Sequence, residues 1–149
     1  MKIKLITIGR FYHFHLARQL YKFALLDKIY SGYPKYKLKD EYGIPKNKIK
    51  TYPYYKLPSL FFNKYLEKNF PEIDNYLSIL SLKKLSQKVS KNIGEADVLI
   101  AQSTAGLEAG KKIKILGGKF ICDRASTHIL VQNETLKEAY NDLNMKFNG

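Results

Sequence analysis

The sequence contains little cysteine, little arginine and no long uncharged apolar run. Its single cysteine, Cys122, excludes a disulfide framework within the chain and is typical of a protein from a reducing cytoplasm. No apolar run approaches the roughly 18 residues that span a bilayer, so we predict no transmembrane helix. The first ten residues, MKIKLITIGR, lack a long apolar core followed by small residues at a cleavage site. They therefore do not have the pattern of a secretory signal peptide.

Positive charge is what the sequence has in excess. Its 149 residues include 26 lysines and arginines against 13 acidic residues, which gives a net charge of +13. Such a charge favours anionic partners, namely nucleotide sugars, nucleic acid or an acidic membrane surface. Only three of the basic residues are arginines. Because specific base recognition prefers arginine, nucleic acid is the least favoured of these partners.

The length and the pattern of apolar residues predict one α/β domain over residues 1–149. Short apolar runs predict strands at 2–8, 28–31, 48–52, 97–101 and 119–122. Helical spacing predicts helices at 13–26, 59–69, 71–92, 105–115 and 126–145, with Ser126 capping the last. Alternating strands and helices imply parallel strands joined by right-handed crossovers. The predicted fold is a single Rossmann-like domain with an open, mainly parallel sheet flanked by helices.

Two of the predicted strands end in residues that could bind a ligand, because open α/β sheets bind ligands beyond the carboxyl ends of their strands. Gly9 and Arg10 follow the first strand and suit an anion such as a diphosphate. The dinucleotide fingerprint GxGxxG is absent, and taken alone Gly9 is better explained by a plain strand-to-helix turn. Ser103 and Thr104 follow the fourth strand. They offer hydroxyls to a sugar, with a close backbone approach at Gly106, or they simply cap a helix.

A third group of polar residues follows the fifth strand. Asp123 and Arg124 come directly after an apolar run, where charge is costly unless it is paired or exposed in a cleft. His128 lies near the start of the last helix and can hydrogen-bond a sugar hydroxyl. The alternative is a structural pair between Asp123 and Arg124 with an ordinary capping turn.

The other histidines and the cysteine favour no metal site. His13 and His15 are two residues apart, so on a helix they point to different faces and make a poor metal pair. No Cys/His cluster has the spacing of a zinc site. Cys122 lies on a predicted buried strand without an activating motif, which favours an inert core thiol over a nucleophile.

The stretch 50–70, KTYPYYKLPSLFFNKYLEKNF, mixes aromatic residues with lysines. This composition suits an anionic membrane surface, where rings lie among the headgroups and ammonium groups contact anionic lipid. It is equally consistent with rings that close the core beneath solvated lysines. Both interpretations remain open at this point.

Four segments together resemble the N-terminal half of a family 4 glycosyltransferase, an enzyme with two Rossmann-like domains in the GT-B arrangement. The segments are IGRFYHFHLARQLYK, IYSGYPKYKLKDE, AQSTAGLEAGKK and LGGKFICDRASTHILVQNETLKEAY. They span nearly the whole chain in the expected order. The resemblance implies a retaining transfer of a sugar from a nucleotide sugar to a glycan or lipid-linked acceptor, with no cofactor and no catalytic metal.

The resemblance also implies roles for particular residues. Gly9 and Arg10 would lie near the donor phosphates, and Ser103 and Thr104 would face the acceptor. The expected catalytic residues are Arg124 and His128, close to the transferred sugar or its leaving phosphate. No second Rossmann pattern follows Gly149, so we expect the donor-binding domain to be absent from this chain, and the isolated chain not to turn over.

Two further expectations complete the sequence analysis. The single cysteine indicates a cytoplasmic protein, and the mixture of aromatic residues and lysines at 50–70 would allow a peripheral contact with the inner face of the membrane. The alternative function is a noncatalytic α/β module that binds an anionic ligand, a membrane surface or nucleic acid, which the net charge of +13 would also serve.

Overall fold

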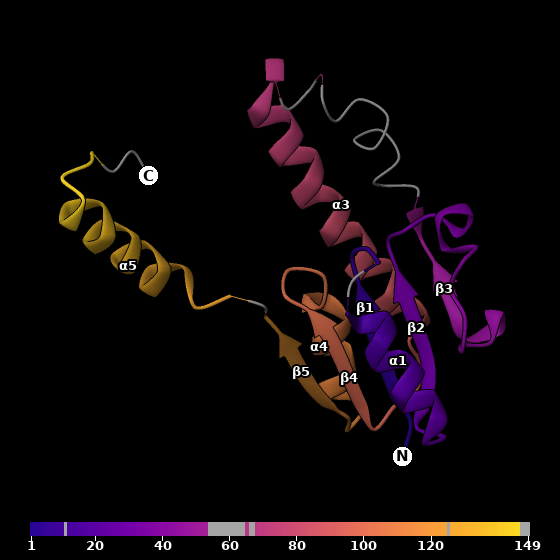
Figure 1. The fold of residues 1–149 in the computed structure, drawn as a ribbon. Coiled ribbons are helices and arrows are strands. Elements are labelled where there is room, and N and C mark those ends of the chain that lie inside the picture. Colours follow the sequence, from indigo (N-terminus) through magenta and orange to yellow (C-terminus); the bar gives the residue numbers. More distant parts are fainter. Residues whose placement is uncertain (11, 54–64, 66–67, 125, 147–149) are drawn as a thin grey trace.

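The structure is a computed structural model that describes residues 1–10, 12–53, 65, 68–124 and 126–146 (Figure 1). A five-stranded parallel sheet has the strand order β3-β2-β1-β4-β5. Helices flank this sheet, so the prediction of one Rossmann-like α/β domain is confirmed. In chain order the elements are β1 (Ile3–Thr7), α1 (His13–Lys22), β2 (Leu26–Ser31), the 3₁₀ turns η1 (Lys35–Leu38) and η2 (Lys46–Lys48), β3 (Ile49–Thr51), α3 (Pro71–Asn92), β4 (Val98–Gln102), α4 (Leu107–Ile115), β5 (Lys119–Asp123) and α5 (Ile129–Asp142).

The core consists of two apolar layers, one on each face of the sheet. Leu5 of β1 faces α1 and packs in one cluster with Phe14 and Ile29. Ile6, the next residue of β1, belongs to the opposite cluster, which includes Val89 of α3 as well as residues of α4. The burial of both faces explains why β1 is a continuous apolar run, since a central parallel strand is covered on both sides.

A buried lysine fastens the centre of the sheet to the segment that precedes β4. Lys4 lies on β1 and is only 5% exposed. Its ammonium group donates to the carbonyls of Ile93 and Glu95 and lies 3.2 Å from the Asp27 carboxylate. The charge is therefore paired and hydrogen-bonded, as a buried charge must be.

Helix α1 ends earlier than the sequence predicts. The apolar spacing continues to about residue 26, but the helix stops at Lys22, and Ala24 has a φ of +55°. This left-handed conformation reverses the chain and lets β2 begin at Leu26. Helix α3, by contrast, runs over the predicted residues 71–92, and Gly94 with a φ of +56° follows its end.

The last part of the chain departs furthest from the prediction. Helix α5 begins at Ile129, and His128 rather than Ser126 caps it, because His128 Nδ1 accepts from the Leu130 amide at 3.3 Å. No residue of α5 is buried, and the helix lies apart from the sheet (Figure 1). Strand β5 is an edge strand with exposed residues, so the Cys122 thiol is exposed and is not the core thiol that was predicted.

The predicted helix at 59–69 and most of the aromatic stretch 50–70 lie outside the described residues. Both interpretations of that stretch therefore stay predictions. Across the described parts of the chain, no helix combines the length and the hydropathy that crossing a bilayer requires.

Candidate functional site

The strand order places a topological switch point between β1 and β4. From β1 the chain proceeds through α1 to β2 and β3, and from β4 it proceeds through α4 to β5 on the other side of the sheet. The connections after β1 and β4 therefore run to opposite faces of the sheet, and open α/β sheets bind ligands at the carboxyl ends of such strands. Gly9 and Arg10 follow β1, and Ser103 and Thr104 follow β4. The fold thus brings these four predicted residues to the same edge of the sheet.

Gln102, the last residue of β4, fixes the end of β1. Its side-chain oxygen accepts from the Ile8 amide at 3.2 Å. The Thr7 hydroxyl in turn donates to the Gly9 carbonyl at 3.0 Å. Gly9 is buried in this turn, while the Arg10 side chain is 42% exposed and leaves it. The loop after β1 is therefore held by hydrogen bonds from two strands, with a guanidinium group at its exposed side.

The loop after β4 contains a residue in an unusual backbone conformation. Thr104 is exposed and has a φ of +75°, a region that β-branched residues rarely adopt. Ser103 donates its amide to the Asp123 carbonyl at 2.7 Å, which anchors the loop to β5. Glycine at position 106 is explained by packing within the protein and not by the close approach of a ligand. A Cβ atom there would lie 2.5 Å from the Cβ atom of Ala101 and 3.0 Å from the Phe120 ring.

Tyr12, His13 and Asp123 form a cluster, here called the Asp123 cluster, that joins the start of α1 to the end of β5. One carboxylate oxygen of Asp123 accepts from the Tyr12 hydroxyl at 2.7 Å and lies 3.1 Å from His13 Nε2. The Tyr12 and His13 rings stack with their centres 4.4 Å apart. Asp123 pairs with these residues and not with Arg124, so the structural Asp–Arg pair considered above is not formed.

The imidazole of the Asp123 cluster is buried, and its pKa is lowered. His13 is fully buried, and neither of its ring nitrogens has a hydrogen bond of good geometry within the described residues. Burial lowers the pKa of His13, and the nearby Asp123 carboxylate opposes this only in part. The hydrogen bond to Asp123, with burial, raises the pKa of Tyr12. His13 is therefore held in its neutral form beside a carboxylate.

Arg10, Arg18 and Glu41 form a second cluster, here called the Glu41 cluster. The Glu41 side chain is only 3% exposed and lies between the two guanidinium groups, 2.5 Å from Arg10 Nε and 2.8 Å from Arg18 Nη1. Arg18 Nη2 also contacts His15 Nδ1 at 2.8 Å, and the guanidinium lies 5.0 Å from the centre of the Tyr42 ring. Two arginines share one carboxylate, so the cluster keeps an excess positive charge.

A pocket of about 380 Å³ opens over this Glu41 cluster. Tyr12 lines the pocket as well as binding Asp123, so it borders both clusters. The terminal nitrogens of Arg10 have no partner among the described residues, since only its Nε binds Glu41. The arrangement can therefore bind an anion through a preoriented guanidinium group. The lining residues are Arg10, Tyr12, Phe14, His15, Arg18, Glu41 and Tyr42.

The two expected catalytic residues lie on the exposed segment after β5. Arg124 is exposed, and its Nε lies 3.5 Å from the Ser126 hydroxyl. His128 is exposed and accepts a hydrogen bond from Leu130 through Nδ1, so its proton belongs on Nε2, which remains open to a ligand. Neither side chain is anchored by a contact that the structure gives with the loops after β1 or β4.

Sequence reasoning missed the two clusters as units. The signal for His13 was available, because it is four residues before Ala17 and seven before Leu20, on the apolar stripe of α1. The signal for Glu41 was weaker. It is one of two acidic residues within a lysine-rich stretch, and nothing local places it against Arg10 and Arg18.

Comparisons with models of protein families, with curated proteins and with solved structures found no match. The class that the fold and site define is therefore an α/β domain of Rossmann-like topology with an arginine-lined pocket at the carboxyl edge of its sheet.

Proposed function

We propose that this chain is the acceptor-side domain of a retaining glycosyltransferase of the GT-B type. The enzyme would transfer a sugar from a nucleotide sugar to a hydroxyl of a glycan or lipid-linked acceptor. The observation that supports this most is the position of Gly9, Arg10, Ser103 and Thr104 on the two loops that flank the switch point. These are the residues that the resemblance assigns to the two substrates.

The chemistry needs a group that stabilises the leaving diphosphate. The bond from the anomeric carbon to the diphosphate oxygen breaks, and negative charge collects on the diphosphate oxygen atoms. The acceptor hydroxyl bonds to the anomeric carbon on the same face of the sugar, and its proton passes to the departing diphosphate. Arg10 is suited to this charge because Glu41 fixes its Nε and leaves its terminal nitrogens available. Arg124 is exposed, and its planar guanidinium group offers a second pair of N–H donors that can bind two phosphate oxygens at once. Preoriented positive groups of this kind are a large source of catalysis.

The acceptor hydroxyl needs partners that both donate and accept hydrogen bonds. Ser103 and Thr104 carry such hydroxyls at the end of β4. The exposed Nε2–H of His128 can donate to a sugar hydroxyl. The proposal therefore assigns Arg10 and Arg124 to phosphate, and the hydroxyl residues and His128 to sugar.

The test is a transfer assay on the complete gene product that contains this chain, with a panel of nucleotide sugars. Arg124→Lys keeps the charge but loses the planar pair of donors, and His128→Ala removes the imidazole. Each variant should slow transfer by about 10²–10³. Lys137→Gln, an exposed change on α5, is the control that should leave transfer unchanged. Normal rates in both site variants would remove these residues from catalysis, and an absence of transfer with every nucleotide sugar would overturn the proposed activity.

A second candidate function is a noncatalytic module that binds an anionic ligand. The Glu41 cluster favours it, because two arginines around one carboxylate make an anion site that needs no further residue for binding. Titration of the chain with pyrophosphate distinguishes the two candidates. Binding that Arg10→Gln abolishes, together with no transfer by the complete gene product, would favour the module.

A further inference from the structure

The connection between β2 and β3 is rich in lysine and folds into two tight turns. Pro34 precedes η1 and Pro45 precedes η2, and their φ values of −65° and −58° fit the start of each turn. Leu38 is buried and packs in the same apolar cluster as α1. Lys48 donates to the Leu26 carbonyl at 2.8 Å. These contacts hold the segment against the sheet, so the backbone positions of its lysines are fixed.

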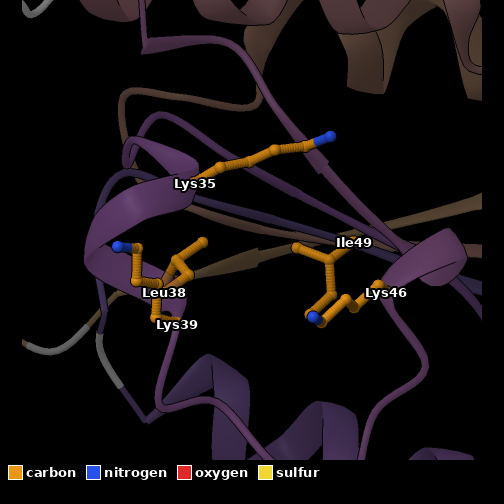
Figure 2. A pocket seen from close by; sticks show the side chains of 5 residues that line it. All are labelled: Lys35, Leu38, Lys39, Lys46 and Ile49. Atoms are coloured by element: carbon orange, nitrogen blue, oxygen red, sulfur yellow. The ribbon is translucent and has the colours of Figure 1, made fainter.

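A pocket of about 200 Å³ lies between the two turns and the start of β3. Leu38 and Ile49 extend toward each other from opposite sides of the pocket and form its apolar floor (Figure 2). Lys35, Lys39 and Lys46 complete the lining and are called the pocket lysines below. The pocket lies beside the β3 edge of the sheet, whereas the switch point lies between β1 and β4, so it is separate from the site described above.

The pocket lysines differ from the other lysines of the segment 35–50. The Lys37 ammonium lies 5.5 Å from the centre of the Tyr33 ring, and that of Lys50 lies 5.8 Å from the Tyr52 ring. Lys48 binds a backbone carbonyl. The three lysines that do not line the pocket thus have partners within the protein. For the pocket lysines, the described residues provide neither an ion pair nor a hydrogen bond.

The acidic residues of the same segment do not neutralise the pocket. Glu41 is occupied by Arg10 and Arg18. Asp40 is exposed and forms no ion pair with a described residue. Three lysine side chains therefore surround a small pocket without a described counter-ion, with their ammonium groups apart from one another (Figure 2), and an anion in the pocket would balance this charge.

We propose that this pocket binds an aliphatic phosphomonoester, with the phosphate among the pocket lysines and the alkyl chain over Leu38 and Ile49. Lysine binds phosphate as a point charge at the end of a flexible stem, so the three ammonium groups can turn toward one dianion. A water molecule occupies about 30 Å³ of liquid, so the pocket has room for a phosphate and a short chain. The apolar floor favours this ligand over inorganic phosphate. The inference does not depend on the proposed transfer activity.

The test follows amide chemical shifts of the ¹⁵N-labelled chain during titration with hexyl phosphate. We expect the largest shifts within residues 35–49, and binding at least about tenfold tighter than that of inorganic phosphate, since a short alkyl chain adds apolar burial. The variant with Lys35→Gln, Lys39→Gln and Lys46→Gln should weaken hexyl phosphate binding by about tenfold or more. The matched control carries Lys111→Gln, Lys112→Gln and Lys114→Gln on α4, which remove the same charge elsewhere.

Two further measurements separate the contribution of the apolar floor to binding from that of the pocket lysines and from any loss of folding. Ile49→Thr should weaken hexyl phosphate but leave inorganic phosphate unchanged, because it alters only the floor. Thermal unfolding of each variant checks that it is folded. Equal loss of binding in the pocket variant and the α4 control, or shifts spread over the whole basic surface, would overturn the proposal.

Vesicles distinguish the two sources of such a phosphate. Vesicles that contain phosphatidic acid present the phosphomonoester on a lipid, whereas phosphatidylserine vesicles present a charged surface without it. Binding of both hexyl phosphate and phosphatidic acid vesicles, each lost in the pocket variant, assigns the lipid headgroup as a source. Binding of hexyl phosphate alone assigns a soluble ligand. Equal binding to both vesicle types, with no hexyl phosphate binding, contradicts the proposal.

Discussion

The part of the chain from β1 to β3, residues 3–51, and the β5–α5 unit differ in how the protein holds their polar side chains. In the first unit, Glu41 and Lys4 are buried and bound to residues distant in sequence. In the second, Arg124 and His128 are exposed, and their described hydrogen bonds join residues two positions away. The first unit therefore positions its site through tertiary packing. Beyond Asp123, the second relies on local contacts, although it contains the segment with the most specific resemblance.

The largest expected effect is on the free energy of unfolding, when one apolar residue from each unit is changed to alanine. Phe14→Ala removes a ring that is 1% exposed and should cost about 3–5 kcal/mol in the free energy of unfolding. Leu130→Ala removes a side chain that is 65% exposed and should change stability by less than about 0.5 kcal/mol. Urea denaturation measures both. A comparable loss in Leu130→Ala would mean that α5 packs against the domain in solution, and the contrast between the units would fail.

A smaller effect is expected at the Glu41 cluster. Glu41→Gln keeps the shape of the side chain but removes the charge shared by Arg10 and Arg18. It should destabilise the protein by about 2 kcal/mol, because hydrogen bonds to charged groups are the stronger ones. Glu134→Gln on the exposed α5 is the matched control and should be near neutral. Equal midpoints for the two variants in urea would show that the buried carboxylate does not fasten this unit.

The third prediction concerns pH. Burial lowers the pKa of His13 in the folded protein, so the unfolded chain binds this proton more readily. The stability that neutral His13 contributes is present above the unfolded pKa of about 6.5 and is lost as pH falls below it toward the folded pKa. Urea midpoints between about pH 7.5 and pH 5.5 should fall, and less so in His13→Phe. The exposed His15, changed to Gln, is the control whose profile should follow the wild type.

The smallest effect is expected at the cap of α5. His128→Ala removes the hydrogen bond to the Leu130 amide, and should reduce global stability by less than about 0.5 kcal/mol because α5 buries no side chain. Amide hydrogen exchange gives a more sensitive test of how α5 is held, since an unpacked helix of this length is only marginally stable in water. The amides of α5 should exchange far faster than those of α3. Equal protection in the two helices would place α5 within the cooperative unit.

Much of the fold followed from periodicity in the sequence. Continuous apolar runs gave the strands, and the Pro71 start with the glycine at 94 gave both ends of α3. The end of α1 did not follow, because a left-handed Ala24 overrode a helical pattern that continues beyond it. The exposure of Cys122 did not follow either. An apolar strand has the same sequence pattern in the centre of a sheet and at its edge.

The candidate site was predictable only where residues come directly after strands. Gly9, Arg10, Ser103 and Thr104 could be placed together because parallel strands share one carboxyl edge. Glu41 could not be placed, since its partners depend on the path of the β2–β3 connection. The pairing of Asp123 with Tyr12 and His13 spans more than a hundred residues and has no local signal.

The central position of β1 has a consequence for the order of folding. β1 pairs with β2 through a short connection, but its pairing with β4 joins partners such as Ile3 and Val98, which are 95 residues apart. Closing so long a loop has a larger entropic cost than closing the β1–α1–β2 turn, and contacts of high sequence separation slow folding. We therefore expect the amino-terminal unit to form first and the β1–β4 pairing to limit the folding rate. The carboxyl edge that carries the candidate site is completed only in that late step.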